Sequence, residues 1–400
     1  MKDRTDIPRE TSIATGSRPA ILMVSLTTPF ERSSGTGQRS GLLYEALAQI
    51  GDVDILVLSE GDAESFGKTS LGDDRIMATV HVPASANIFG RYRPKQKLTG
   101  RIESLLGHSL ASYQLIVGRY LWPICQLVIP DGTRTIVDLD DFRFRYSKAL
   151  PWSGALVFER LKKHVSYRMA KKQLMRFDAA FLVNELDRES VDTGRALLLA
   201  NIPRTVERSP GAPPGGYKLL FVGSLWYRPN ADGINWFLEN VWPTILEAVP
   251  QATLDLVGSA PESVRSDWER HSNVKAPGFV QDIDAMYAQA AVVAIPIFSG
   301  GGSNIKLLEC LSHRRICVAS EFTIRAFGGM LQDGKHLLAA DDAKEFSDRI
   351  IGVLRDPQAY AQMAENGYDL VASRFTADAF FRNVQALAKQ VLDAKPDLAG

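Results

Sequence analysis

The sequence predicts an α/β protein made of two doubly wound domains. Two observations carry this prediction. Short, β-rich apolar runs alternate with helical stretches, and the alternation stops at one stretch rich in proline and glycine before it starts again. Nearly continuous apolar runs are typical of parallel strands that are buried on both faces of a sheet. A length of 400 residues agrees, because it exceeds one ordinary compact core.

The runs define the expected strands and domain limits. Five precede the interruption: ILMVSL (21–26), VDILVL (53–58), YQLIVG (113–118), RTIVDL (134–139) and AAFLVN (179–184). Four follow it: KLLFVG (218–223), ATLDLVG (252–258), AVVAIPI (291–297) and RICVAS (315–320). The expected parts are a disordered leader, a first domain, the linker ERSPGAPPGG, a second domain and a final helix that packs back on the first domain: 1–19, 20–206, 207–216, 217–375 and 376–400.

Composition excludes several classes of protein. The chain is 45% hydrophobic and 23% charged with zero formal net charge, as in soluble globular proteins. Its three cysteines form no CxxC pair, and no histidine stands at metal-ligand spacing, so we expect no disulfide framework, no metal and a reducing cytoplasm. The leader lacks the apolar core of a signal peptide. No apolar run approaches the roughly 18 residues that span a bilayer.

The stretch FSGGGSNIKLLECL (298–311) combines a glycine loop with the start of a helix. Ser303 or Asn304 is the expected N-cap. Helix N-termini offer unsatisfied N–H groups, and glycines let a ligand approach them closely, which favours a phosphate. Lys306 opposes the helix dipole in the first turn unless an anion pairs with it. Glu309 shares its face and is suited to two vicinal hydroxyls. The alternative is an ordinary exposed Lys306–Glu309 ion pair.

Four blocks of the second domain occur in a familiar order: LLFVGSLWYRPNADGINWFLENVWPTI, LDLVGSAP, VKAPGFVQDIDAMYAQAAVVAIPIFSGGGSNIKLLECLSHRRICVAS and LLAADDAKEFSDRIIGVLRDP. Through most of residues 217–375 the chain resembles the family 4 glycosyltransferases of the GT-B fold, in particular bacterial polysaccharide enzymes. The N-terminal half matches loosely. The resemblance implies two Rossmann-like domains that face a central cleft.

The resemblance also implies roles for individual residues. Lys306 would hold the diphosphate of a nucleotide sugar and Glu309 its ribose. The remaining donor-site residues would lie around the base and the diphosphate: Phe279, Val280, Gly223, Ser224, Gly301, Gly302, Ser303 and Asn304. Two departures stand out. The family's E-x7-E pattern places an acid where this chain has Gly301, and SLWYRPN replaces the usual basic residues after the first strand. Arg228 either substitutes for them or caps the next helix.

The first domain has a second glycine-bearing stretch, FERSSGTGQRSGLLYEAL (30–47). It places Gly35 and Gly37 in a loop ahead of a helix, and in the resemblance this loop faces the reacting sugar. Gln38 and Arg39 stand at the helix start and are candidates to contact donor phosphate or acceptor. A plain strand–turn–helix connection remains the alternative.

The stretch VDLDDFRFRY (137–146) follows another strand. A carboxylate at the carboxyl end of a strand can orient or deprotonate an acceptor hydroxyl, so Asp138 and Asp140 are catalytic candidates beside Lys306 and Arg39. A loop-capping aspartate is the alternative. The resemblance suggests transfer with retention, in which the leaving diphosphate takes the acceptor proton and charge stabilisation dominates.

Two basic stretches, 91–101 and 160–176, are candidates for contact with an anionic membrane surface, the second as a basic amphipathic helix. A solvated helix face is the alternative. Nucleic acid is not expected, because the chain is neutral overall and has no recognised motif.

We therefore expect a cytoplasmic GT-B glycosyltransferase, peripheral on the inner face of the membrane. It would be a hexosyltransferase that moves a sugar from a UDP- or GDP-sugar donor, without a cofactor, to a lipid-linked or growing polysaccharide acceptor. Alternatives are a nucleotide-sugar epimerase or hydrolase of the same fold, and a non-catalytic nucleotide-sugar-binding subunit.

Overall fold

The computed structural model describes residues 18–31, 35–72, 75–83, 92–140, 142, 155–191, 195–203, 206, 211–302 and 304–394. For 35–36 and 155–163 it describes the helix without its side chains. Most of the expected leader, residues 207–210 of the expected linker, and Ser303 lie outside the described residues.

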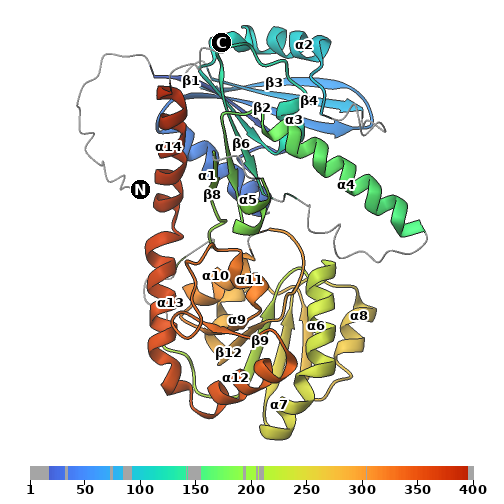
Figure 1. Ribbon diagram of the computed structural model, residues 1–400, viewed down its shortest axis with the longest axis vertical. Coiled ribbons are helices and arrows are strands. Elements are labelled where there is room, and N and C mark those ends of the chain that lie inside the picture. The colour runs from blue at the N-terminus through green and yellow to red at the C-terminus, as the bar shows by residue number, and fades with distance from the viewer. Residues whose placement is uncertain are drawn as a thin grey trace, which may run out of the picture.

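The first domain contains a sheet of strand order β3-β4-β2-β1-β5-β6-β7-β8 (Figure 1). Neighbouring strands are parallel except β3 and β4. The strands are β1 (Ala20–Ser25), β2 (Asp52–Gly61), β3 (Ser65–Gly72), β4 (Arg75–Pro83), β5 (Leu115–Arg119), β6 (Arg134–Leu139), β7 (Ala179–Leu182) and β8 (Ala196–Leu198). The helices are α1 (Gly35–Ala48), α2 (Gln96–Leu106), α3 (Leu121–Cys125), α4 (Ala155–Leu174) and α5 (Glu185–Val191), with a 3-10 turn at Leu110–Ser112.

Strand β1 shows why the central runs are apolar throughout. Ile21 and Met23 belong to the core that includes helix α1, whereas Leu22 and Val24 belong to the core that includes α2, α3 and α4. All four side chains are fully buried. A strand covered on both faces needs apolar residues at every position, so the alternation typical of half-exposed strands is absent.

The second domain repeats this architecture with a fully parallel sheet of order β11-β10-β9-β12-β13-β14. Its strands are β9 (Lys218–Val222), β10 (Thr253–Val257), β11 (Val274–Gly278), β12 (Val292–Ile295), β13 (Ile316–Ala319) and β14 (Leu338–Ala339). Its helices are α6 (Arg228–Asn240), α7 (Trp242–Ala248), α8 (Glu262–Trp268), α9 (Ile283–Gln289), α10 (Ile305–Ser312), α11 (Glu321–Arg325), α12 (Ala343–Arg355) and α13 (Ala361–Arg374), with a 3-10 turn at Pro357–Tyr360.

The last helix, α14 (Ala377–Asp393), leaves the second domain and lies against α1 of the first (Figure 1). Its apolar side chains recur every three or four residues, and they are buried: Phe380, Val384, Leu387, Ala388 and Val391. The Gln385 amide donates hydrogen bonds to the Ala46 carbonyl at 3.3 Å and to Gln49 Oε1 at 2.7 Å. One continuous core therefore includes α1, α14 and the second domain.

Every apolar run expected as a strand is one, but the sequence did not predict β3, β4, β8, β11 and β14. Strand β3 lies at the sheet edge, pairs antiparallel with β4 and is mostly exposed. Strand β11 is also an edge strand, and its buried and exposed residues alternate. Edge strands do not need continuous apolar sequence, so their signal is weak.

The carboxyl ends of the two sheets face one another. Asn184, just after β7, donates a hydrogen bond from its amide to the carbonyl of Gly302, in the loop between β12 and α10, at 3.4 Å. The backbone N–H of Glu185 donates to the Ala326 carbonyl at 2.8 Å. Ligands of doubly wound sheets bind outside the carboxyl ends of the strands, so this region is the place to look for the site.

Two helical glycines should respond oppositely to alanine. A Cβ at Gly100 in α2 would meet nothing within 4 Å, so Gly100→Ala should raise the free energy of unfolding by about 0.5–1 kcal/mol. A Cβ at Gly233 in α6 would lie 2.1 Å from the Pro296 carbonyl oxygen, so Gly233→Ala should lower it by about 1–3 kcal/mol. Urea unfolding of both variants checks this. Stabilisation by both would contradict the close approach of α6 to Pro296.

Candidate active site

The glycine loop, residues 298–302, joins β12 to α10. The strand ends before Pro296, which has no N–H to donate. The hydroxyls of Ser320 and Thr323 both donate to the carbonyl of Ile297, the latter at 3.3 Å. Ile297, the residue before the loop, is therefore fixed by hydrogen bonds from the start of helix α11.

Its glycines adopt backbone conformations that other residues rarely reach. Gly300 has φ 118° and Gly302 has φ 83°. A Cβ at Gly300 would also lie 3.1 Å from Tyr227 Oη, and the same hydroxyl accepts a hydrogen bond from the Gly301 N–H at 3.2 Å. Asn304 is the N-cap of α10, as predicted, but it is left-handed (φ 45°) and its side chain makes no capping hydrogen bond. The loop therefore lies close against the start of α6.

Lys306, in the first turn of α10, points back to the end of β9. Its Nζ donates to Asn230 Oδ1 at 2.7 Å and lies 5.4 Å from the centre of the Phe221 ring. A Cβ at Gly223 would come within 3.1 Å of Lys306 Cε. The structure thus brings together Lys306, Gly223 and the glycine loop, which are separate in the sequence.

The ammonium group of Lys306 lacks a compensating partner. Burial lowers the pKa of Lys306 to about 8, and the charge of Glu309 raises it only in part. Among the described residues, no carboxylate forms an ion pair with this ammonium. The open alternative of an ordinary exposed Lys306–Glu309 pair does not fit, because both side chains are partly buried. A desolvated cation in this position favours an anionic ligand.

Glu309 lies one turn further along α10, where α9 supports it. Tyr287 is fully buried and its hydroxyl donates to Glu309 Oε2 at 3.4 Å. The His313 ring stacks on Tyr287 with 4.5 Å between centroids, and its Nδ1 lies 2.7 Å from the Glu309 carbonyl oxygen. His313 Nε2 is 2.9 Å from Asp284 Oδ1. The position of Glu309 therefore depends on packing between α9 and α10.

The other predicted donor-site residues lie at several places in the second domain. The carbonyl of Ser224 accepts from the Asn230 amide at 2.9 Å. Arg228 is exposed at the first position of α6 and its Nε lies 3.4 Å from Asp232 Oδ2. Phe279 is 75% exposed, as an aromatic side chain that meets a ligand would be, while Val280 packs against the core.

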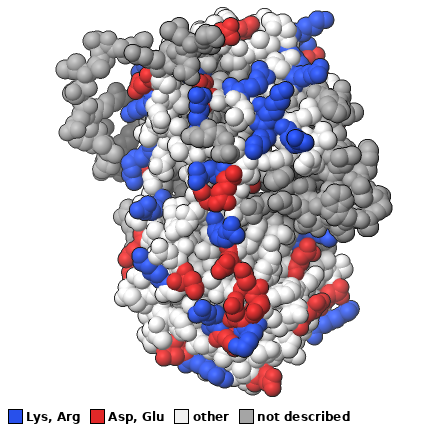
Figure 2. Space-filling view, in the orientation of Figure 1, with Lys and Arg blue, Asp and Glu red and all other residues white. Residues whose placement is uncertain are grey.

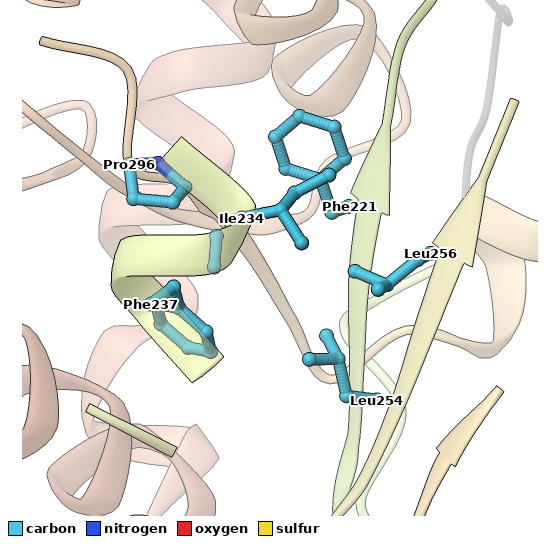
Figure 3. Close-up of a pocket in the computed structure, with 7 residues that line it drawn as sticks. Phe221, Ile234, Phe237, Leu254, Leu256 and Pro296 are labelled. Atoms are coloured by element: carbon cyan, nitrogen blue, oxygen red, sulfur yellow. The ribbon is translucent and has the colours of Figure 1, made fainter. Parts of the chain in front are cut away.

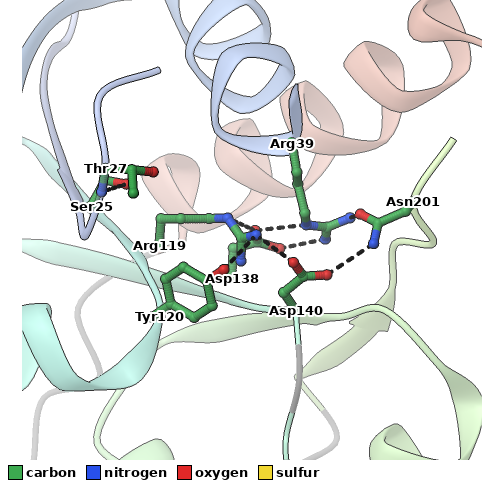
Figure 4. A network of polar contacts seen from close by, with 8 residues as sticks. All are labelled: Ser25, Thr27, Arg39, Arg119, Tyr120, Asp138, Asp140 and Asn201. Atoms are coloured by element: carbon green, nitrogen blue, oxygen red, sulfur yellow. Dashed lines mark hydrogen bonds and ion pairs between the residues drawn. The ribbon is translucent and has the colours of Figure 1, made fainter. Parts of the chain in front are cut away.

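The first domain contributes a network of charges at the carboxyl ends of β5 and β6 (Figure 4). Arg39 donates to both carboxylate oxygens of Asp138, with Nε 2.9 Å from Oδ2, and from Nη1 to Asn201 Oδ1 at 2.9 Å. Arg119 donates from Nη2 to Asp140 Oδ2 at 2.8 Å. Removing one partner of so buried an ion pair lowers the free energy of unfolding by about 3–5 kcal/mol. Arg39 and Asp138 are therefore important for the stability of the fold.

Asp138 and Asp140 differ in their access to solvent. Asp138 is fully buried between Arg39 and Arg119, whereas the Asp140 side chain is 18% exposed. Burial alone would raise the pKa of Asp140, but the charges of Arg119 and Arg39 and hydrogen bonds from Asn201 and Arg119 outweigh it and lower that pKa. Asp140 is therefore held as a carboxylate that accepts hydrogen bonds.

The prediction that Gly35 and Gly37 lie in a loop ahead of a helix is wrong. Helix α1 begins at Gly35, so both glycines lie in its first turn rather than in a loop ahead of it. The helix starts early enough that Arg39 lies in its second turn and reaches Asp138. Gln38 is partly buried.

Sequence reasoning missed Arg119, Asn201 and Asn230. Arg119 is fully buried at the end of β5, and its guanidinium lies 4.2 Å from the ring centre of Tyr120, which has φ 72°. A charged residue directly after the apolar run YQLIVG was the available signal for Arg119. Asn201 and Asn230 gave none, because single asparagines are common in loops and at helix starts.

A small apolar cavity lies behind the site, between α6 and the sheet (Figure 3). Its volume is about 10 Å³, room for roughly one water molecule, and no polar side chain lines it. The lining residues are Phe221, Ile234, Phe237, Leu254, Leu256, Ala294 and Pro296. The cavity is a packing gap of the core and cannot hold a nucleotide sugar.

Comparison with known sequences gives a family match for the second domain and one relative over nearly the whole chain. Residues 216–356 match the model of the family Glycosyl transferases group 1. The chain is 20% identical over 395 residues to an uncharacterized 44.6 kDa protein from the cps region of Klebsiella pneumoniae, covering 91% of this chain and 98% of that protein.

Solved structures share the fold over nearly the whole chain. Sucrose-phosphate synthase from Thermosynechococcus elongatus superposes with a TM-score of 0.67 at 19% identity, covering 94% of this chain and 100% of that one. HepE from Anabaena, in complex with UDP and glucose, has a TM-score of 0.59 at 13% identity, covering 94% and 99%. The second domain is similar in sequence to the group 1 glycosyltransferases, and the two domains form the GT-B fold. The prediction of the GT-B fold is confirmed, and the family match of the second domain agrees with the predicted class of glycosyltransferase.

The pKa of Lys306 makes a prediction about stability. A lysine with a pKa of about 8 in the folded protein and about 10.4 when unfolded binds more protons in the unfolded state between these values. Its contribution to stability therefore rises with pH across that window. Lys306→Met and Lys306→Leu should both stabilise the protein more at pH 7 than at pH 10, relative to wild type. Urea unfolding at the two pH values measures the difference; a difference independent of pH would contradict the lowered pKa.

Proposed function

We propose that the protein transfers a sugar, with retention of configuration, from a nucleotide diphosphate donor to a lipid-linked or growing polysaccharide acceptor. The observation that carries the proposal is the uncompensated ammonium of Lys306 beside the glycine loop. The structure of HepE in complex with UDP and glucose supports the choice of donor, and the relative from a cps region supports a role in polysaccharide biosynthesis.

On the donor side, charge stabilisation is the main chemical contribution. When the bond between the sugar and the diphosphate breaks, negative charge grows on the leaving phosphate. In this proposal, Lys306 and the N-terminus of α10 stabilise that charge, and the glycine loop lets the phosphate approach. Glu309 would accept hydrogen bonds from the ribose hydroxyls. The exposed ring of Phe279 lies at the end of β11, where it would meet the base.

On the acceptor side, the network of Figure 4 favours orientation over proton removal. A general base works best with a pKa near the working pH, and the pKa of Asp140 is lowered instead. In this proposal Asp140 orients the acceptor hydroxyl, and the leaving phosphate takes its proton. Asp138 and Arg39 would keep Asp140 and Asn201 in place through their own contacts.

A lipid-linked acceptor requires contact with a membrane, and α4 offers a surface for it. Figure 2 shows Lys and Arg gathered on the first domain where α4 lies in Figure 1. His164, Arg168, Lys172 and Arg176 recur every four residues and are exposed, while Ala170 and Leu174 are buried. Among the described residues, no helix is long and apolar enough to cross a bilayer. The other basic stretch, 91–101, is less available, because Arg101 pairs with Glu64 at 2.6 Å.

The donor site can be tested by activity. Lys306→Ala and Glu309→Ala should each lower sugar transfer at least tenfold, about 1.4 kcal/mol of transition-state stabilisation, because each removes a group that would bind the donor. Transfer is measured as nucleotide released from a panel of UDP- and GDP-sugars.

The matched control is Lys344→Ala, which removes an exposed lysine paired with Asp348 on α12 and should leave activity unchanged. Near-wild-type turnover in both site variants would overturn the assignment. Nucleotide release that does not rise when an acceptor saccharide is added would favour a hydrolase or epimerase, or a binding subunit, over a transferase.

Charge reversal can test the membrane contact. Arg168→Glu, Lys172→Glu and Arg176→Glu together should weaken binding to anionic vesicles at least tenfold, since each basic residue near the surface contributes about 1 kcal/mol. Lys162 and Lys163, whose side chains lie outside the described residues, extend the set. Lys171 is left unchanged, because its Nζ donates to the Ser190 carbonyl at 2.9 Å.

The control for this test carries the same three reversals on α12, at Lys344, Arg349 and Arg355, which are exposed on the second domain. Vesicle sedimentation compares the two variants. Equal binding by both would contradict a membrane role for α4.

A further inference from the structure

Asn230 connects three parts of the donor site. Its amide nitrogen donates to the Ser224 carbonyl at 2.9 Å, in the turn after β9. Its amide oxygen accepts from Lys306 Nζ at 2.7 Å, across 76 residues of sequence. The side chain is 4% exposed, so both ends of the amide are satisfied within the protein.

The orientation of this amide follows from its two contacts. An asparagine side chain has one accepting and one donating end, and here the backbone carbonyl of Ser224 takes the donating end. Only the oxygen is then left to face Lys306. A side chain at Gly223 would crowd both groups, because a Cβ there would lie 3.0 Å from Asn230 Nδ2 and 3.1 Å from Lys306 Cε. The turn after β9 therefore sets the direction in which the lysine points.

A neutral acceptor has an electrostatic consequence that a carboxylate would not have. An aspartate in the same place would hold the ammonium more strongly but would cancel its charge. Asparagine holds the ammonium and leaves its charge in place. Glu309, on the same helix, is the charged group that acts on Lys306. The Phe221 ring on the other side contributes no net charge.

We propose that Asn230 is the positioning residue for Lys306: its amide oxygen fixes the ammonium at the end of β9 and leaves its positive charge for a diphosphate anion. This inference rests on the proposed function for the identity of the anion. It deepens that proposal, because it explains how the lysine stays both ordered and uncompensated before the donor arrives.

The test compares wild type with Asn230→Asp, which keeps the shape, adds a charge and removes the amide donor to the Ser224 carbonyl. In the free protein, the pH dependence of labelling of Lys306 by an amine-reactive reagent reports its charge state, read by mass spectrometry of the labelled peptide. The aspartate should move the labelling midpoint upward by at least one pH unit. Asn230→Ala, which removes the acceptor, should not move it upward. Circular dichroism and thermal unfolding check that each variant folds.

Calorimetry with UDP and GDP gives the second measurement. At pH 8.5 wild type should take up protons on binding, because the diphosphate restores the charge of Lys306. Asn230→Asp should lose this uptake and bind at least tenfold more weakly, since its carboxylate repels the phosphate. Asn230→Ala should also bind more weakly, because the lysine is no longer held.

The outcomes separate the two proposals. Labelling midpoints and affinities that are the same in wild type and Asn230→Asp would overturn the role of Asn230. A shifted midpoint with no binding of UDP or GDP by wild type would support the positioning of Lys306 and overturn the nucleotide site.

Discussion

The hydrogen bond between Lys306 and Asn230 is the contact on which the proposed donor site depends. It joins the start of α10 to the start of α6, and it needs both helices close to the end of β9. Gly233 allows α6 to approach Pro296, and Gly223 leaves room for the lysine side chain. Helix dipole and burial both disfavour a charged lysine here. The site is thus arranged around a cation that an anionic ligand would stabilise.

The two domains present different arrangements of charge at the carboxyl ends of their sheets. The second domain presents the uncompensated cation, whereas the first presents a closed set of ion pairs in which Arg39 and Arg119 balance Asp138 and Asp140. The contact of Asn184 with Gly302 brings the carboxyl ends of the two sheets together, and α14 packs on α1. Because Arg39 also lies 5.4 Å from the Phe380 ring centre, the charge network touches the helix that spans both domains.

Local patterns predicted much of this structure. The strand runs, the loop at 298–302 and the helix after it appear where expected, because continuous apolar sequence and glycine act over a few residues. The same reasoning missed the edge strands β3 and β11, which need no apolar run, and placed Gly35 and Gly37 ahead of α1 rather than within it. Glycine is permissive in conformation and does not by itself mark where a helix begins.

The sequence alone determined the alternation of strands and helices and the placement of Lys306 and Glu309 on one face of α10, since helical spacing decides which side chains share a face. Only the tertiary structure decided what surrounds them. Asn230 reaches Lys306 because β9 and β12 are neighbours, and Arg119 meets Asp140 because β5 and β6 are. Strand order depends on packing between residues far apart in the sequence, so only the tertiary structure determines the electrostatic environment of the site.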